Sequence, residues 1–202
     1  SLIIPHADDY KSLNDLLSSI KFWTKKPDEI VVVDSSIFNI NLRPDFEEYF
    51  NKNNIKFNII KAQNAFPGYA RNIGIQYSEG SFLAFLDCNT VPENHWLQSS
   101  DILINDESLF GVWGSTQYNC EGYFQEIIRA STYGSNTLDT LPGSIIRRKC
   151  FQIVGLFIPT VRAGEDGDWF QRVRLHKLPF HSQSKPLLKY NLSKQVTFMS
   201  IL

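Results

Sequence analysis

The chain has 202 residues, of which 43% are hydrophobic and 20% charged, so its composition is that of a globular protein able to form one α/β domain. Its 20 Lys and Arg residues against 21 Asp and Glu residues give a formal net charge of −1, which argues against a general affinity for nucleic acid. The three cysteines include no Cys-x-x-Cys pair, which argues against a disulfide framework and a thiolate zinc site.

Membrane and export signals are weak in this sequence. The apolar runs are too short to cross a bilayer, and no charged segment followed by an apolar one precedes the first predicted strand. We therefore expect a cytoplasmic protein with reduced thiols. Lys185, Lys189 and Lys194 would favour peripheral contact with the inner face of a membrane if they lay on a helix, although a solvated face is the commoner explanation.

The first half of the chain alternates short β-branched runs with helical patterns. Strands are predicted at residues 2–4, 30–33, 56–60 and 82–86, and helices at about 13–20, 45–51 and 68–79. This order predicts an α/β fold with a mainly parallel, Rossmann-like sheet flanked by helices. In such sheets ligands bind beyond the carboxyl ends of the strands.

The second half is less regular. We expect helices at 93–105, 120–133 and 165–176, a strand at 110–118, and a short strand within 141–148. The last twenty or so residues are ambiguous. Since the sequence contains neither repeats nor an obvious linker, residues 1–202 are predicted to form a single domain.

Polar clusters follow three of the predicted strands, at 6–9, 34–36 and 87–90, and the topology should bring them together. In the last cluster, Asp87 and Asn89 alternate at a strand end and could hold Mg²⁺ or Mn²⁺, which prefer oxygen ligands. The alternative for that pair is a turn that ends the strand. Asp34 could accept a hydrogen bond from a ribose hydroxyl or a base N–H, or it could cap the following turn.

Arg71 lies in the first turn of the helix that begins at Gly68. The N–H groups of that turn and a guanidinium together suit a pyrophosphate, although most arginines are simply exposed.

Three carboxylates, Glu165, Asp166 and Asp168, crowd the first turn of the last predicted helix. Helix capping accounts for one or two of them. Helical spacing places Asp166 on the apolar face formed by Trp169, Phe170 and Val173. We therefore expect Asp166 to point inward, as a general base at the edge of a cleft would, and Asp168 to point away.

Taken together, these segments resemble a family 2 glycosyltransferase of the GT-A fold. The matching stretches are 2–5, 29–36, 70–74, 80–89, Arg147 and Arg148 with Val154, Gly155 and Phe157, and 164–166. They occur in the family's order over about residues 1–175. The resemblance implies an inverting transferase that uses a nucleotide-sugar, by default a UDP-sugar, and a divalent metal, Mn²⁺ or Mg²⁺. Residues 1–90 would be the nucleotide-binding half and residues 91–202 the acceptor-binding half, with a saccharide or lipid-linked saccharide as acceptor.

The resemblance also implies a role for each matching residue. The nucleotide would be bound by Pro5, His6, Asp34, Arg71 and Asp87, the metal by Asp87 and Asn89, and the donor sugar by Gly143 and Ser144; Asp166 would be the catalytic base, with Glu165 beside it.

Two residues depart from the family's pattern. Asn89 stands where the family has a second aspartate, so metal affinity should fall, although an amide oxygen is still a hard donor. His6 stands where the family often has Thr or Ser, and its imidazole could stack on a base or hydrogen-bond to it.

Two other functions compete with a transferase. One is a catalytically silent GT-A domain that binds a nucleotide or glycan; the altered metal motif favours it, and Glu165 with Asp166 argues against it. The other is a nucleotide-binding oxidoreductase, which the missing Gly-x-Gly-x-x-Gly after the first strand argues against.

Overall fold

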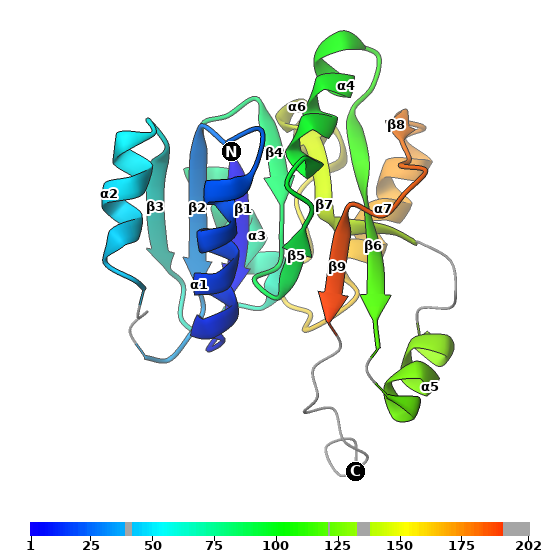
Figure 1. Ribbon diagram of the computed structural model, residues 1–202. Coiled ribbons are helices and arrows are strands. Elements are labelled where there is room, and N and C mark those ends of the chain that lie inside the picture. Colours follow the sequence, from blue (N-terminus) through cyan, green and yellow to red (C-terminus); the bar gives the residue numbers. More distant parts are fainter. Residues whose placement is uncertain (39–41, 121, 133–137, 192–202) are drawn as a thin grey trace.

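The computed structural model describes residues 1–38, 42–120, 122–132 and 138–191, which form one mixed sheet with helices on both faces (Figure 1). Its first half holds the parallel neighbours β3 (Lys56–Lys61), β2 (Glu29–Asp34), β1 (Leu2–His6) and β4 (Phe82–Phe85), in that spatial order. The predicted parallel nucleus is confirmed, because β1, β2 and β3 cover their predicted runs and β4 ends one residue before the predicted Leu86.

The sheet continues with strands of mixed direction. β7 (Leu138–Arg147) runs antiparallel to β4 and to β6 (Gly111–Asn119), and β9 (Leu188–Asn191) and β5 (Thr90–Pro92) complete the order. The short β8 (Phe180–His181) pairs with the start of β6. The antiparallel β7 therefore joins the two halves of the chain into one sheet.

The helices divide between the two faces of the sheet (Figure 1). The first half contains α1 (Tyr10–Ser19) with the 3₁₀ turn η1 (Ile20–Phe22), α2 (Asp45–Lys52) and α3 (Pro67–Tyr77). The second half contains η2 (Trp96–Ser99), α4 (Ser100–Asn105), α5 (Tyr123–Thr132), α6 (Arg148–Val154) and α7 (Glu165–Leu175). No helix among the described residues is long and apolar enough to cross a membrane.

Alternation along β1 fixes which helices cover which face. Leu2 and Ile4 point to one side, where they pack in one core cluster with residues of α1 and α2. Ile3 points to the other side and joins a second cluster with residues of α3, α6 and α7. All three side chains are fully buried. The start of α3 and the start of α7 thus share one face of the sheet.

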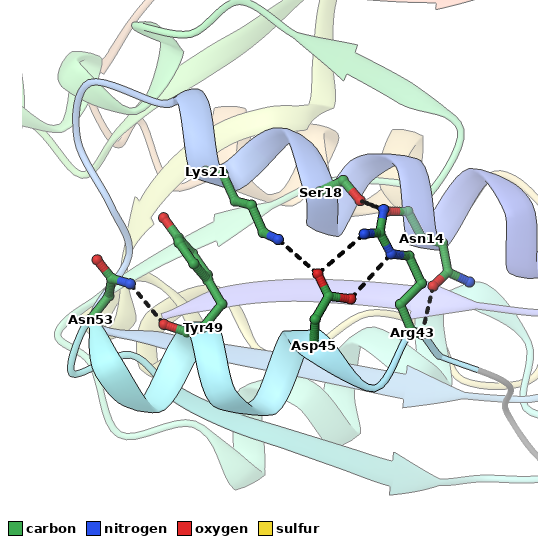
Figure 2. A network of polar contacts seen from close by, with 7 residues as sticks. All are labelled: Asn14, Ser18, Lys21, Arg43, Asp45, Tyr49 and Asn53. Carbon is green, nitrogen blue, oxygen red and sulfur yellow. Dashed lines mark hydrogen bonds and ion pairs between the residues drawn. The ribbon is translucent and has the colours of Figure 1, made fainter.

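A polar network braces α2 against α1 on the first face (Figure 2). The carboxylate of Asp45 accepts from Lys21 Nζ at 2.9 Å and from Arg43 Nε at 3.1 Å. The backbone N–H of Arg43 also donates to Asn14 Oδ1 at 3.0 Å. Because these side chains are partly exposed, the network orients α2 and adds little stability.

The contact of α3 with β1 depends on a glycine. A Cβ built on Gly74 would overlap Cγ2 of Ile3, a buried strand residue that cannot move away easily. We expect Gly74→Ala to lower the free energy of unfolding by about 1–3 kcal/mol, the usual cost of overpacking a core. Denaturant unfolding should measure this loss. The matched control is Gly167→Ala in α7, where a Cβ meets nothing within 4 Å, and where alanine should be neutral or slightly stabilising. Equal effects of the two substitutions would contradict the predicted clash.

The structure corrects two expectations for the second half. The single helix expected at 93–105 is η2 followed by α4, and the hydroxyl of Ser99 donates to the Trp96 carbonyl at 2.6 Å, a local bond that competes with regular helix. The short strand expected within 141–148 is the ten-residue β7. It continues through Gly143, whose φ of +87° accompanies a register shift against β6.

The tail contains strands where we considered a helix. Lys189 lies in β9, and its Nζ pairs with Glu93 at 2.8 Å. Lys185 is exposed in the loop before β9, and Lys194 lies outside the described residues. The helical basic face that would favour a membrane surface is therefore not formed by Lys185 and Lys189. The helix predicted at 120–133 is confirmed as α5, although residues 121 and 133 are also outside the described part.

Candidate active site

Three strand ends place a row of polar side chains at the carboxyl edge of the sheet. His6, Asp34 and Lys61 are cross-strand neighbours, since His6 of β1 pairs with Asp34 of β2, which pairs with Lys61 of β3. The Nδ1 of His6 lies 3.0 Å from Asp34 Oδ1, and Lys61 Nζ donates to Asp34 Oδ2 at 2.7 Å. Pro5, half-buried, precedes His6 in β1. The sequence predicted His6 and Asp34 for this edge but did not identify Lys61.

Asp34 is a buried carboxylate with partners on both oxygens. The backbone N–H of Ser36 also donates to Oδ1, at 3.1 Å. Burial alone would raise the pKa of Asp34, but the hydrogen bonds from Lys61, Ser36 and His6 outweigh it, so the pKa lies below its usual value. Asp34 therefore presents a charged acceptor at neutral pH.

Arg71 of α3 joins two parts of the chain that are far apart in sequence. Its side chain is buried, with Nη1 donating to Glu165 at 2.6 Å and Nη2 donating to Asp87 at 2.8 Å. Burial would lower the pKa of Arg71, but Asp87 and Glu165 outweigh that effect and raise it. Both terminal nitrogens thus hold carboxylates in this structure. A grip on a pyrophosphate remains a prediction, and the observed contacts of Arg71 position Asp87 and Glu165.

The loop after β4 carries the candidate metal ligands. Asp87 is half-buried with one oxygen on Arg71, and Asn89 Nδ2 donates to the hydroxyl of Tyr190 in β9 at 2.7 Å. Cys88 lies between Asp87 and Asn89 in the sequence. Burial, together with the negative charges of Asp87 and Asp9, raises the pKa of its thiol to about 12. Cys88 therefore stays protonated and is a poor ligand for a metal ion. Within the described residues, no group of three or more His, Cys, Asp or Glu side chains could hold a metal.

The donor set still suits a hard divalent ion completed by phosphates. Asp87 binds Arg71 through one carboxylate oxygen and keeps the other, and Asn89 keeps its amide oxygen, since its hydrogen bond to Tyr190 uses Nδ2. Mg²⁺ is commonly bound by one or two protein oxygens together with substrate phosphates. These two residues therefore fit a shared metal site and do not form a complete protein cage.

The first turn of α7 buries Glu165, whereas the sequence predicted that Asp166 would point inward. Glu165 is buried against Arg71, whereas Asp166 is only half-buried and accepts the Gly167 N–H at 2.8 Å. The buried face of α7 runs through residues 165, 169 and 173, four residues apart, so it is rotated relative to the face we assigned to Asp166. Asp168, also half-buried, pairs with Arg172 at 2.8 Å, and its expected direction away from the core stays a prediction. Asp166 thus lies at the rim of the buried cluster.

The expected donor-sugar residues lie inside the sheet. Ser144 is fully buried in β7, where its hydroxyl accepts the Gly114 N–H at 2.8 Å and donates to the Thr140 carbonyl at 2.6 Å. A Cβ on Gly143 would lie 2.7 Å from Cδ1 of Leu188. The structure therefore does not bring Ser144 to an exposed surface, and its observed contacts hold the bulge between β6 and β7.

Residues 1–164 match the model of the family described as glycosyl transferase family 2. The chain belongs to this family. The resemblance inferred from the sequence motifs is therefore confirmed.

Two curated relatives of this family 2 domain are bacterial and archaeal. The chain is 29% identical over 108 residues to the poly(ribitol-phosphate) β-N-acetylglucosaminyltransferase TarS of Staphylococcus aureus, over 52% of this chain and 19% of TarS. It is 27% identical over 162 residues to the glycosyltransferase AglE of Haloferax volcanii, over 78% of this chain and 51% of AglE. The alignments thus span about half of AglE and a fifth of TarS.

Known structures share the fold at low sequence identity. The S. aureus TarS fragment 1–349 in complex with UDP-GlcNAc has a TM-score of 0.69 and 19% identity, covering 100% of this chain and 60% of the fragment. The mannosyltransferase PcManGT of Pyrobaculum calidifontis, in complex with GDP-Man and Mn²⁺, has a TM-score of 0.66 and 12% identity, covering 96% of this chain and 57% of that one. These matches establish the GT-A fold of the family 2 domain.

The sequence missed three partners within this family 2 site. Lys61 could have been found from strand alternation, because it ends a strand directly beside Asp34. Tyr190 lies in the tail that showed no clear pattern. The contact of Glu165 with Arg71 joins residues 94 apart in sequence, and no local pattern signals it.

Proposed function

We propose that this family 2 domain transfers a sugar from a nucleotide-diphosphate donor, a UDP-sugar, to a hydroxyl group of a saccharide or lipid-linked saccharide, with inversion. The observation that carries the proposal is the meeting of Asp87 and Glu165 on the single guanidinium of Arg71. This contact joins the loop proposed to bind the nucleotide to the turn that presents Asp166. Donor and general base can then act on the same anomeric carbon.

The donor side is assigned to residues 1–90. Asp34, with His6 and Pro5 beside it, would receive the nucleoside, and Asp87 would contact the ribose side. The complexes of TarS with UDP-GlcNAc and of PcManGT with GDP-Man support a nucleotide-sugar at this fold. Residues 91–202 would supply the acceptor side, including Asp166. A cytoplasmic location and peripheral membrane contact stay predictions.

Asp166 would act as the general base. An acceptor hydroxyl attacks the anomeric carbon from the face opposite the nucleotide; a new C–O bond forms there as the bond to the diphosphate oxygen breaks. The hydroxyl proton passes to Asp166, and the diphosphate leaves with the bonding electrons. The transition state has oxocarbenium character, as in other glycosyl chemistry. Among the described residues, one carboxylate oxygen of Asp166 has no hydrogen-bond partner, which leaves it open to an acceptor.

Asp87 and Asn89 would hold a divalent metal together with the donor phosphates. A bound metal supplies positive charge that stabilises the leaving diphosphate. Arg71 keeps Asp87 in place for this role by holding one of its oxygens.

The neutral Asn89 should limit metal affinity. We expect Asn89→Asp to bind Mn²⁺ more tightly, by about tenfold or more in the presence of UDP, because a second carboxylate adds charge to the site. Isothermal titration calorimetry measures the affinity directly. Asn94→Asp is the control, since it adds the same charge at an exposed position outside the loop. Unchanged Mn²⁺ affinity in Asn89→Asp would remove residue 89 from the coordination shell.

The proposed function is tested by binding and turnover together. Thermal stability should rise with UDP and UDP-sugars in the presence of Mn²⁺, because a ligand that binds the folded state stabilises it. Released UDP should then be measured with and without saccharide acceptors. A domain that binds donor but neither hydrolyses nor transfers it would instead be the silent GT-A domain, which Asn89 favours. Failure to bind any nucleotide diphosphate would overturn both functions.

A further inference from the structure

The polar row at the ends of β1, β2 and β3 is open at one end only. The side chains of His6 and Asp34 are 0% and 1% exposed, whereas that of Lys61 is 42% exposed. Lys61 is therefore the member of this row that is accessible to a ligand. The Lys61 ammonium is held in place by two acceptors, Asp34 Oδ2 at 2.7 Å and the Phe38 carbonyl at 2.6 Å.

The row offers a fixed order of hydrogen-bonding groups. A lysine ammonium has three donors and no acceptor, and an ionised carboxylate only accepts. Two of the Lys61 donors are used by Asp34 and Phe38, so one remains for a ligand. Asp34 Oδ2 accepts one bond from Lys61 and can accept another. A donor on the exposed Lys61 thus lies 2.7 Å from an acceptor on the buried Asp34.

This pair complements a nucleobase in which an N–H lies next to a carbonyl. Uracil presents such an edge, with the N–H for Asp34 and the neighbouring carbonyl oxygen for Lys61. Cytosine presents the reverse, a bare ring nitrogen beside an amino group, which would set an acceptor against Asp34 and a donor against Lys61. Guanine shares the N–H and carbonyl edge but is a larger purine.

We propose that Lys61 is a specificity-determining residue, which selects donors whose base carries an N–H beside a carbonyl and rejects cytidine nucleotides. The inference rests on the proposed function, since it assumes that the nucleoside lies at Asp34. The inference goes beyond the proposed function because it assigns base selection to Lys61, a side chain that also hydrogen-bonds to Asp34 and to the Phe38 carbonyl. A purely structural Lys61 would affect all nucleotides alike, so the ratio of affinities separates the two roles.

The test measures the dissociation constants of UDP, CDP and GDP with the full chain, Mn²⁺ present, by isothermal titration calorimetry. The wild type should prefer UDP over CDP by at least about tenfold, the scale expected for one pair of base-edge contacts. Lys61→Met should reduce that preference to about threefold or less, and Lys61→Arg, which keeps the donors, should retain most of it. Lys56→Met is the control, because Lys56 lies at the other end of β3 and pairs with Glu79 at 2.6 Å; its preference should equal the wild type's.

Each outcome bears on a different claim. Equal weakening of UDP and CDP in Lys61→Met, with the ratio kept, would overturn the specificity role. The wild type could bind GDP more tightly than UDP and still lose its selection against CDP in Lys61→Met. This result would support the role of Lys61 and overturn the assignment of a UDP-sugar. If the wild type bound none of the three, both the proposed function and this inference would fall.

Discussion

Replacing Asp166 with asparagine is expected to lower the turnover of sugar transfer at least about a hundredfold while donor affinity stays unchanged. Asparagine keeps the shape of the side chain and can still accept the Gly167 N–H, which Asp166 accepts at 2.8 Å. It cannot take a proton from the acceptor hydroxyl, so the loss should fall on turnover. Steady-state kinetics with released UDP, together with calorimetric donor binding, measure the two quantities separately.

Asp168→Asn is the matched control for this experiment. Asp168 lies in the same turn of α7, but its carboxylate is already paired with Arg172 at 2.8 Å. The control removes the same charge from the first turn of the helix and so matches any change in the local field. If Asp168→Asn lost as much turnover as Asp166→Asn, the effect would belong to the charge of this turn, and the assignment of Asp166 as base would fail.

The parallel nucleus could be predicted because its signals are local. The run 30–33 is apolar on both faces, as a central parallel strand requires, and β2 is indeed buried along its whole length. Spacing of leucines gave α1, and Gly68 and Gly80 bounded α3 well. In β7 the local signal misleads, because Pro142 and Gly143 are typical of a turn. There the antiparallel neighbours β4 and β6 keep the chain extended, with a bulge at Gly143.

The site was predictable as far as topology determines it. His6, Asp34 and Asp87 follow strand ends, so a parallel sheet had to place them on one edge. The orientation of α7 was not predictable in the same way. Asp166 and Glu165 are adjacent in the helix, so a small rotation of α7 about its axis would bury either one. The buried guanidinium of Arg71 favours the rotation that buries Glu165, because it forms an ion pair with that carboxylate. An ion pair between residues far apart in the sequence produces no periodic pattern from which it could be predicted.

The cluster of Arg71, Asp87 and Glu165 joins three separate parts of the chain. Asp87 belongs to the loop after β4, Arg71 to α3, and Glu165 to α7, so one guanidinium holds these three elements together. Glu165 is then a positioning residue, since its carboxylate binds Arg71 and it precedes Asp166 by one position.

The stability of the fold should depend strongly on this cluster. We expect Arg71→Met to lower the free energy of unfolding by about 3–5 kcal/mol, because it leaves the buried Glu165 carboxylate without its partner. Urea unfolding followed by tryptophan fluorescence measures the loss. Asp45→Asn is the control: it removes a carboxylate from the exposed network of Figure 2, and its effect should be much smaller.

A double variant distinguishes an unpaired charge from a simple loss of packing. Arg71→Met combined with Glu165→Leu removes both members of the buried pair, so no uncompensated carboxylate remains between α3 and α7. The double variant should therefore be more stable than Arg71→Met alone, although Asp87 still loses its partner. Asp87 is exposed enough for water to solvate it, which keeps that remaining cost small. If the double variant were no more stable than Arg71→Met, the uncompensated Glu165 carboxylate would not be the main cause of the loss, and the paired charges would not be what joins the two helices.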